Sequence, residues 1–248
     1  MALFAENAMI TAEILDIVDP WQDRSPAEAS DIFFAAAAPL GVTYLQTRVY
    51  RRPTTRLTAK SHWAAGGVVR RVAPESWPGS AAFNYVCFDC NPLLRPIMEG
   101  RTRYAFGDFA PHGDPRFGAY WDALGEAGVS EALCATSYGP KGAIASAHIG
   151  FSDRDADPAR RSVQLAGLLL TEYLLEATVL ADDPDPDLTA RERDCLAFVA
   201  EGKTDWEISV ILGLAESTVR FHVDNARRKL DAVNRAQAAA KLVLMRLV

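Results

Sequence analysis

The stretch at residues 188–242 reads LTARERDCLAFVAEGKTDWEISVILGLAESTVRFHVDNARRKLDAVNRAQAAAKL and is the most informative part of this 248-residue chain. Thr189 and Glu192 have the spacing of a capping box, in which a hydroxyl and a carboxylate satisfy backbone donors at the start of a helix. The helix that begins there ends at Gly202, where a positive φ costs little. A second, short helix is expected over residues 205–212.

A third helix is expected over residues 216–230, after a tight turn at Gly213. Its apolar side chains recur at helical spacing and form one stripe, and its polar side chains lie off that stripe. The stripe consists of Val219, Val223, Ala226 and Leu230, and the polar set of Ser217, Arg220, Asp224, Arg227 and Arg228. A short helix, a glycine turn and a longer basic helix are the parts that hold a recognition helix in the major groove of DNA. The alternative is a helical bundle whose arginines are simply solvated.

The stretch closely resembles the LuxR-type helix-turn-helix module, and the resemblance extends over nearly all of it. Three positions that support the scaffold in relatives are filled by Glu192, Leu196 and Gly202. The resemblance also implies a fourth helix, about residues 235–247, that pairs with its copy. Its apolar stripe consists of Ala236, Ala239, Ala240, Val243 and Leu247. Two-fold pairing predicts a homodimer on an inverted-repeat double-stranded DNA site, with half-sites about one helical turn apart.

The polar side chains of the module supply the expected DNA contacts. We expect base-edge contacts from Ser217, Arg220 and Asp224, and phosphate contacts from Lys203, Thr218, Arg227, Arg228 and Lys229. Asp224 is a pure acceptor, so it either reads a cytosine amino group or points at a neighbouring arginine.

The charge is distributed unevenly along the chain. The formal net charge is −6, but residues 188–248 hold ten Lys or Arg and eight Asp or Glu, so they carry +2 and the preceding residues carry −8. A mildly basic part therefore follows an acidic one. So small an excess cannot support tight DNA binding by phosphate neutralisation in a single copy, which again favours two copies on one site.

The chain has the features of a cytoplasmic protein. It contains no run of about twenty apolar residues, and its N-terminus lacks the pattern of a signal peptide. Its four cysteines are interpreted mainly as buried apolar side chains. Cys87 and Cys90 form one CxxC pair, but no second Cys or His pair lies nearby, so neither a metal site nor a thiol switch is favoured, and no cofactor is expected.

Residues 181–187 contain two prolines and four aspartates, and we expect an extended linker there. The linker separates a sensing domain, residues 1–180, from a DNA-binding domain, residues 188–248. Residues 159–180 have the spacing of an amphipathic helix, whose apolar stripe serves either the core or a dimer contact.

The first domain alternates between helical and strand-like patterns. Helices are expected at residues 2–18 and 26–39, and strands at residues 42–50, 57–64, 133–138 and 142–151. The turn at residues 139–142 predicts an antiparallel hairpin. The fold class is therefore α+β: an N-terminal α/β/α sandwich with an antiparallel sheet, followed by a C-terminal all-α domain of four helices with the helix-turn-helix.

The first domain shows neither a phosphate-binding glycine loop nor the strand-helix alternation of a receiver. It resembles the autoinducer-binding domain of quorum-sensing LuxR-type regulators. The resemblance rests on ESW (residues 75–77), NPLL (91–94), YAF (104–106) and YWDALGEAGV (120–129). It implies a five-stranded antiparallel sheet, with an acylated homoserine lactone held between sheet and helices by a tryptophan, a tyrosine and an aspartate.

The ligand-contacting positions of that family are only partly matched. Trp77 fills the tryptophan position, and Phe106 stands where another tryptophan is usual. The aspartate is replaced by Asn91, and the tyrosine position falls among Ala81, Ala82 and Phe83. An asparagine accepts a weaker hydrogen bond from the amide of the ligand than a carboxylate does. We therefore expect a non-standard signal, such as an aryl-type or other non-acyl-lactone molecule.

Alternation through residues 142–151 separates small from polar side chains. Ala143, Ala145 and Ala147 fall on one face, and Ser146 and His148 on the other. If the alanines pack on helices, Ser146 and His148 face the ligand pocket, although a lone histidine is more often a satisfied core residue. The alternative functions are a regulator of the same architecture that needs no ligand, and an enzyme. The chain has no GxSxG motif, so the enzyme is the weaker alternative.

Overall fold

The computed structural model describes residues 14, 17, 21, 23–53, 56–154, 158–180 and 187–244. The chain divides into two compact units, of which the larger comprises residues 1–138 and 143–181 and the smaller includes residues 182–248. The predicted helix at residues 2–18 and the predicted linker at residues 181–187 lie outside the described residues, apart from Ile14, Ile17 and Asp187.

The N-terminal unit is built on a five-stranded sheet of order β2-β1-β5-β4-β3, in which every neighbouring pair is antiparallel. The strands are β1 (Val42–Arg51), β2 (Val68–Val72), β3 (Arg103–Ala105), β4 (Glu131–Tyr138) and β5 (Ala143–Phe151). The strands expected at residues 42–50, 133–138 and 142–151 are confirmed, and so is the β4–β5 hairpin.

The strand expected at residues 57–64 is wrong, because a short helix, α3 (Ala59–Ala64), forms there. Thr58 caps this helix: its hydroxyl accepts from the Ser61 N–H at 3.1 Å, and the Ser61 hydroxyl accepts from the Thr58 N–H at 2.9 Å. These local hydrogen bonds favour a helix start over strand pairing. The two edge strands, β2 and β3, were not expected; both are short.

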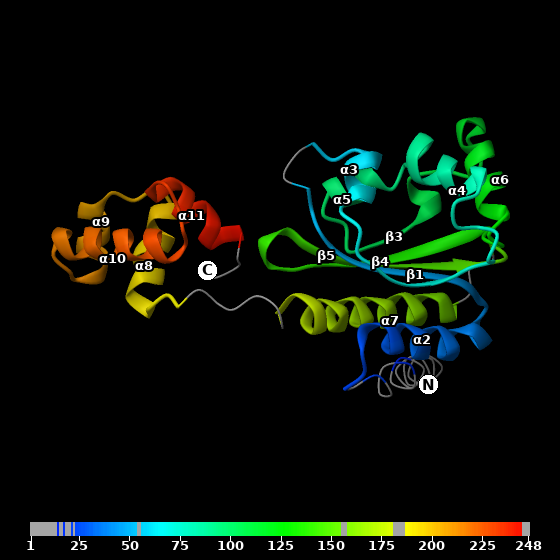
Figure 1. Ribbon diagram of the computed structural model, residues 1–248, viewed down its shortest axis with the longest axis horizontal. Coiled ribbons are helices and arrows are strands. Elements are labelled where there is room, and N and C mark those ends of the chain that lie inside the picture. The colour runs from blue at the N-terminus through cyan, green and yellow to red at the C-terminus, as the bar shows by residue number, and fades with distance from the viewer. Residues whose placement is uncertain are drawn as a thin grey trace, which may run out of the picture. The chain divides into compact units, whose positions relative to one another are not determined.

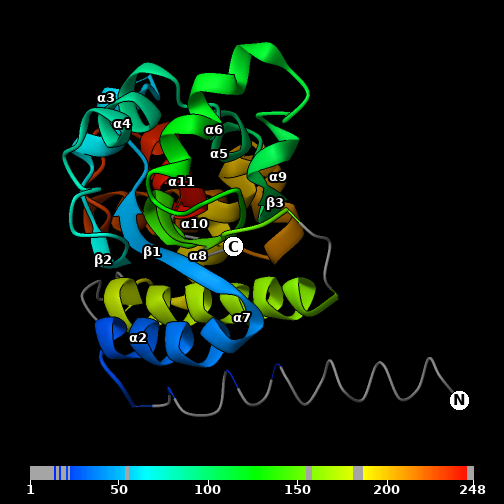
Figure 2. The ribbon, with the colours of Figure 1, turned by 90° about the vertical axis from the view of Figure 1, so that its right-hand side faces the viewer.

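One face of the sheet is covered by α2 (Pro26–Ala37) and α7 (Pro158–Leu175), which lie side by side in Figures 1 and 2. The helix α7 continues as a π-helical segment, η7 (Glu176–Leu180). The three alanines of β5 pack into this core, as expected. Gly167 lets α7 approach closely, since a Cβ at this position would lie 2.7 Å from Cδ1 of Ile149. Small residues on both elements thus set the spacing between helix and sheet.

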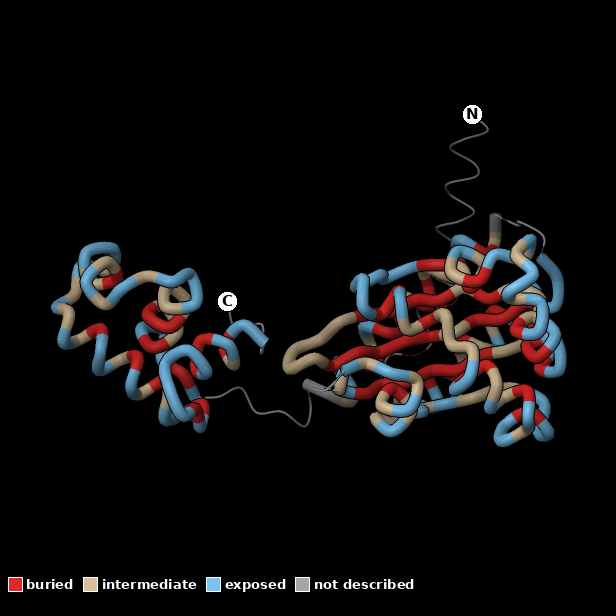
Figure 3. Tube along the Cα trace, turned by 90° about the horizontal axis from the view of Figure 1, so that it is seen from above, coloured by how far each residue is buried: buried red, intermediate tan, exposed pale blue. Residues whose placement is uncertain are grey.

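The opposite face of the sheet carries shorter helices (Figure 1). These are α3, α4 (Ala81–Asn84), α5 (Leu94–Met98) and α6 (Gly118–Gly125), together with the π-helical segment η3 (Tyr85–Asp89) and the short 3-10 helices η4 (Phe106–Asp108) and η5 (Pro115–Phe117). A second core, rich in aromatic side chains, lies on this side. The strands between the two layers are largely buried (Figure 3), which confirms the expected α/β/α sandwich.

The described part of the C-terminal unit, residues 187–244, forms four helices, as expected. They are α8 (Ala190–Ala200), α9 (Asp205–Leu212), α10 (Glu216–Lys229) and α11 (Arg235–Leu244). Gly213, with φ of 64°, ends α9 and permits the tight turn into α10. One expectation needs correction: Ala239 is buried in the core of this unit, so only Ala236, Ala240 and Val243 of the expected stripe are exposed, while Leu247 lies outside the described residues. No described helix is long and apolar enough to cross a membrane.

Candidate ligand cavity and DNA-binding surface

A cavity lies in the N-terminal unit between the sheet and the layer of short helices. Its space between atoms amounts to about 650 Å³, including the part that is open to solvent. The strand β1 contributes Tyr44, Gln46 and Arg48, and α3 contributes His62 and Trp63. A concave site with aromatic walls and a few polar groups is the usual form of a small-molecule site.

Four of the five expected ligand-contacting residues line this cavity: Trp77, Asn91, Phe106 and His148. Ser146 is not among the lining residues, which corrects the expectation that it faces the pocket. It lies two residues before His148 on β5, in register with Arg48 of β1 and Thr136 of β4. The much longer side chain of its register partner Arg48 lines the cavity at this position of the sheet instead.

The polar groups of Trp77 and Asn91 differ in their partners. The indole Nε1 of Trp77 is buried and has no hydrogen-bond partner among the described residues. Asn91 donates from Nδ2 to the carbonyl oxygen of Cys87 at 3.0 Å, which orients its amide oxygen as an acceptor. The edge of Phe106 meets the ring of His148, with 5.3 Å between the ring centroids. The cavity thus offers an unused donor, an oriented acceptor and aromatic walls.

Sequence reasoning missed Arg48, His62 and Trp63. Arg48 is only 1% exposed. Its Nη1 donates to Nε2 of His62 at 2.7 Å, which leaves the proton of that imidazole on Nδ1, and its carbon Cζ lies 4.7 Å from the centroid of the Trp63 ring. The signal that could have found it is the alternation of β1, which places Tyr44, Gln46 and Arg48 on one face of the strand.

Both cavity histidines are held neutral. Burial, followed by the charge of Arg48, lowers the pKa of His62 to about 3 and that of His148 to about 4. A neutral imidazole has one donor and one acceptor nitrogen; in His62 the acceptor is used by Arg48, so that the donor, Nδ1, is left for a ligand.

The stability of the N-terminal unit is expected to fall when the pH is lowered from 7 to 5. The unfolded chain binds protons on His148 near pH 6.5, whereas the folded unit does so only near its lowered pKa of about 4, so the free energy of unfolding decreases as the pH falls through this window. The loss from His148 is about 2 kcal/mol between pH 7 and pH 5. Urea unfolding followed by tryptophan fluorescence at both pH values measures it. The His148→Gln variant should lose part of this pH dependence, and an unchanged dependence would contradict the assignment.

Cys87, the first cysteine of the CxxC pair, is unsuited to thiolate chemistry. Cys87 is buried, and burial raises the pKa of its thiol to about 12. Cys90 is half-buried and unpaired. Within the described part of the chain, no group of three or more His, Cys, Asp or Glu is placed to hold a metal ion.

The helix α10 presents its polar residues on the side away from the core of the C-terminal unit. Val219, Val223 and Ala226 are buried in that core. Ser217, Arg220, Asp224, Arg228 and Lys229 are exposed, and Lys203, Thr218 and Arg227 are half-buried. All eight expected DNA-contacting residues therefore retain accessible surface.

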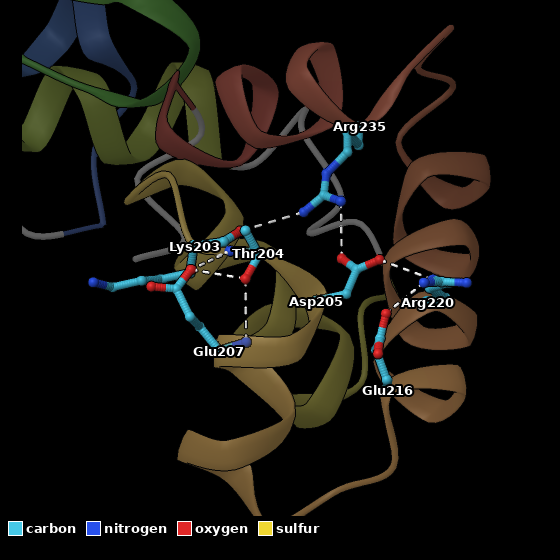
Figure 4. Close-up of polar contacts among 7 residues, drawn as sticks. All are labelled: Lys203, Thr204, Asp205, Glu207, Glu216, Arg220 and Arg235. Carbon is cyan, nitrogen blue, oxygen red and sulfur yellow. Dashed lines mark hydrogen bonds and ion pairs between the residues drawn. The ribbon is translucent and has the colours of Figure 1, made fainter.

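Arg220 is held by two carboxylates at the junction of α9 and α10 (Figure 4). Its Nε donates to Asp205 at 3.1 Å, and its Nη2 forms an ion pair with Glu216. Asp205 also accepts from Nη1 of Arg235 at 2.8 Å, which ties α11 to the same point. A guanidinium that binds carboxylate oxygens in this way can donate the same hydrogen bonds to a guanine edge or a phosphate.

The remaining basic residues of α10 have partners within the unit. Nε of Arg227 lies 3.4 Å from a carboxylate oxygen of Asp224. Asp224 therefore points at a neighbouring arginine, which is one of the two orientations expected for it. Arg228 donates to the side-chain oxygen of Asn225. These contacts are on the surface, where such pairs contribute little and are easily exchanged.

Lys229 is joined to the scaffold residue Glu192. The Glu192 carboxylate is buried and accepts from Nζ of Lys229 at 2.8 Å and from the Thr189 N–H at 2.8 Å. Leu196 is fully buried in the same core, and Gly202 has φ of 84°, in the left-handed region. Lys229 is thus joined to the scaffold, while part of its side chain remains exposed.

Comparison with known proteins places the C-terminal unit in a family. Residues 186–242 match the model of bacterial regulatory proteins of the luxR family. The transcriptional activator LuxR of Aliivibrio fischeri is 53% identical over 58 residues, which is 23% of each chain. The quorum sensing-dependent transcriptional regulator RpaR of Rhodopseudomonas palustris is 37% identical over 139 residues, which is 54% of this chain and 56% of RpaR. The matched parts therefore span from about a quarter to just over half of these relatives.

The fold of the chain is similar to that of Escherichia coli SdiA. The superposition on the SdiA crystal structure covers 97% of this chain and 98% of the SdiA chain, with a TM-score of 0.58 and 22% sequence identity. SdiA in complex with octanoyl-rac-glycerol gives a TM-score of 0.56 at 22% identity and covers 99% of this chain and 96% of its own. The chain therefore carries a LuxR-type helix-turn-helix domain at residues 186–242 and, over nearly its whole length, the fold of SdiA.

Proposed function

We propose that this protein is a small-molecule-responsive transcription regulator of the LuxR type, acting in the cytoplasm as a homodimer in quorum sensing. The observation that carries the proposal is the joining in one chain of an aromatic cavity with an unused buried donor, Trp77, to a luxR-family domain. A ligand that binds only the folded N-terminal unit stabilises that unit by mass action. In this proposal, the stabilised unit pairs with its copy, and the two helix-turn-helix domains then occupy one DNA site together.

The proposed dimer contact of the C-terminal domain uses the exposed part of α11. Ala236, Ala240 and Val243 lie outside the core and are small enough for two helices to approach closely. Two-fold symmetry then makes the preferred DNA an inverted repeat with half-site centres about one helical turn apart.

We also propose that the signal differs from an ordinary acyl-homoserine lactone. Asn91 stands where the resemblance implies an aspartate, and its amide nitrogen is already bonded to the carbonyl of Cys87. Its oxygen can accept a ligand N–H, but without the strength of a charged acceptor. SdiA, whose fold is similar, has been solved with octanoyl-rac-glycerol.

Thermal unfolding of the full chain, with and without organic extracts and a panel of acyl- and aryl-homoserine lactones, tests the sensor. Four of the five tryptophans, among them Trp63 and Trp77 of the cavity, belong to the N-terminal unit, so fluorescence reports mainly on that unit, whereas far-ultraviolet circular dichroism reports on the helices of both units. We expect ligand to raise the temperature of the transition seen by fluorescence, and to leave unchanged the transition of the C-terminal helices in the circular dichroism signal. No rise with any compound, together with specific DNA binding by the untreated protein, would instead establish a ligand-independent regulator of the same architecture.

Replacing Arg220 by alanine is expected to weaken binding to the cognate DNA by about 10- to 100-fold, because a bidentate base contact is lost. Binding to unrelated DNA should change little. The matched control is Arg228→Ala, an expected phosphate contact, which should weaken binding to both DNAs alike and reduce the salt dependence. Fluorescence anisotropy with both DNAs at several salt concentrations measures this. Equal losses on both DNAs for Arg220→Ala would contradict its role in reading bases.

A further inference from the structure

The most unusual side chain of the N-terminal unit is Arg48. It lies in β1, an inner strand of the five-stranded sheet, and lines the cavity. At 1% exposure it is the bulkiest of the described side chains that are fully buried. Arginine is almost never fully buried without a compensating partner.

The partners of Arg48 are all neutral. Its Nε and Nη2 donate to the carbonyl oxygen of Gly66 at 3.2 and 2.6 Å, and Nη2 also donates to the carbonyl of His62 at 3.1 Å. Nη1 donates to Nε2 of His62 at 2.7 Å. The guanidinium also lies over the rings of Tyr50 and Trp63, at 4.6 and 4.7 Å from their centroids. Among the described residues, no carboxylate lies within ion-pair distance of it.

These contacts hold the guanidinium in place without neutralising its charge. A buried cation is costly unless an anion faces it, and carbonyls and aromatic rings compensate only in part. Burial lowers the pKa of Arg48. Of the side chains that also act on this pKa, Tyr50 and Cys87 are neutral at pH 7 and Arg71 is itself a cation. Arg71 is bonded through Nε to Gln46, another residue of the cavity wall, at 2.8 Å. The wall thus carries positive charge that the described residues do not balance.

Unused hydrogen-bond donors at the cavity reinforce this excess. The Nη1 nitrogen of a guanidinium carries two N–H donors, and the described contacts of Arg48 use only one of them. Nδ1 of His62 and Nε1 of Trp77 are both buried without a described partner. The histidine proton lies on Nδ1, because Nε2 accepts from Arg48, so each of these three groups is a donor. A complementary ligand must therefore be rich in acceptors and supply negative charge.

We infer that the ligand of this cavity is a small aromatic carboxylate, whose acid group pairs with Arg48 and whose ring packs among Trp63, Trp77, Phe83 and Phe106. The inference rests on the proposed sensor function and names the chemical class of the signal. A neutral acyl-lactone supplies no charge to the guanidinium, whereas a carboxylate accepts from it in the charge-assisted geometry that arginine favours.

The test compares acids with amides of the same shape. Binding of benzoate, cinnamate and 4-hydroxycinnamate to the full chain at pH 7 is measured by isothermal titration calorimetry against benzamide, cinnamamide and 4-hydroxycinnamamide. We expect at least one acid to bind ten-fold or more tightly than its amide. This preference should vanish in Arg48→Met and persist in part in Arg48→Lys. The control Arg70→Met removes an exposed arginine of the neighbouring strand, paired with Asp31, and should leave the preference intact.

Three results would overturn the inference: equal affinity of acids and amides, no binding by any acid, or an acid preference that survives in Arg48→Met. If Arg48→Met does not fold, Arg48→Lys decides the matter. The inference then requires that this variant still prefers the acid over its amide, but by a smaller factor than the unaltered protein. The fate of the proposed function is read separately. Thermal stabilisation by neutral lactones without acid preference would overturn the inference and leave the sensor standing, whereas no stabilisation by acids, amides, lactones or extracts would overturn both.

Discussion

Replacing Gly67 by alanine is expected to lower the free energy of unfolding of the N-terminal unit by about 4 kcal/mol or more. Gly67 has φ of 79°, and a Cβ there would lie 1.9 Å from the carbonyl oxygen of Val49. Its own carbonyl accepts from the Val49 N–H at 2.7 Å, so the backbone cannot move away without breaking a sheet contact. Urea unfolding of the full chain, followed by tryptophan fluorescence, measures the loss.

The neighbouring glycine provides the matched control. Gly66 also has a positive φ, 65°, but a Cβ there would meet nothing within 4 Å. Gly66→Ala should therefore cost only the left-handed strain, about 1–2 kcal/mol. Similar losses of stability in the two variants would contradict the claim that the close approach of Gly67 to the backbone of Val49 requires a glycine there.

Replacing Glu192 by alanine is expected to destabilise the C-terminal unit by about 3 kcal/mol. The buried carboxylate accepts from Lys229 and from the Thr189 N–H, each at 2.8 Å. Although burial raises the pKa of Glu192, these hydrogen bonds outweigh it and hold the pKa below its ordinary value. The substitution removes the acceptor of both the Lys229 ammonium and the Thr189 N–H at the start of α8. Thermal unfolding followed by circular dichroism at 222 nm measures the effect.

Glu207 is the control for this substitution, because it occupies the same place in a second capping box. Its carboxylate accepts from the Thr204 N–H at 2.8 Å, yet it lies outside the core and has no described lysine partner. Glu207→Ala removes only a helix cap and should destabilise the unit clearly less than Glu192→Ala. If the two losses were equal, the ion pair with Lys229 would contribute nothing.

The C-terminal helices were predictable because their signals are local. The capping box at Thr189 marks the first helix, and the glycine at 213 ends the second. The third was expected at residues 216–230 and is observed at Glu216–Lys229. The role of Ala239 was not predictable, since a small apolar residue on the fourth helix fits an exposed contact and a core equally well.

The cavity was only partly predictable, because its wall depends on contacts between distant residues. Trp77, Asn91 and Phe106 were found through the resemblance, and His148 through strand alternation. Arg48 was missed because an arginine within a strand is normally assigned to the solvent face. Its burial depends on α3, a segment for which the sequence pattern predicts a strand but in which the hydrogen bonds of Thr58 with Ser61 start a helix.

Selection of bound sequences from a random DNA pool by the full chain, beside its Arg220→Ala variant, tests the central claim most directly. The account predicts enrichment of an inverted repeat whose half-site centres lie about one helical turn apart, with that enrichment lost in the variant. Enrichment of no sequence, or of the same sequence by both proteins, would contradict it.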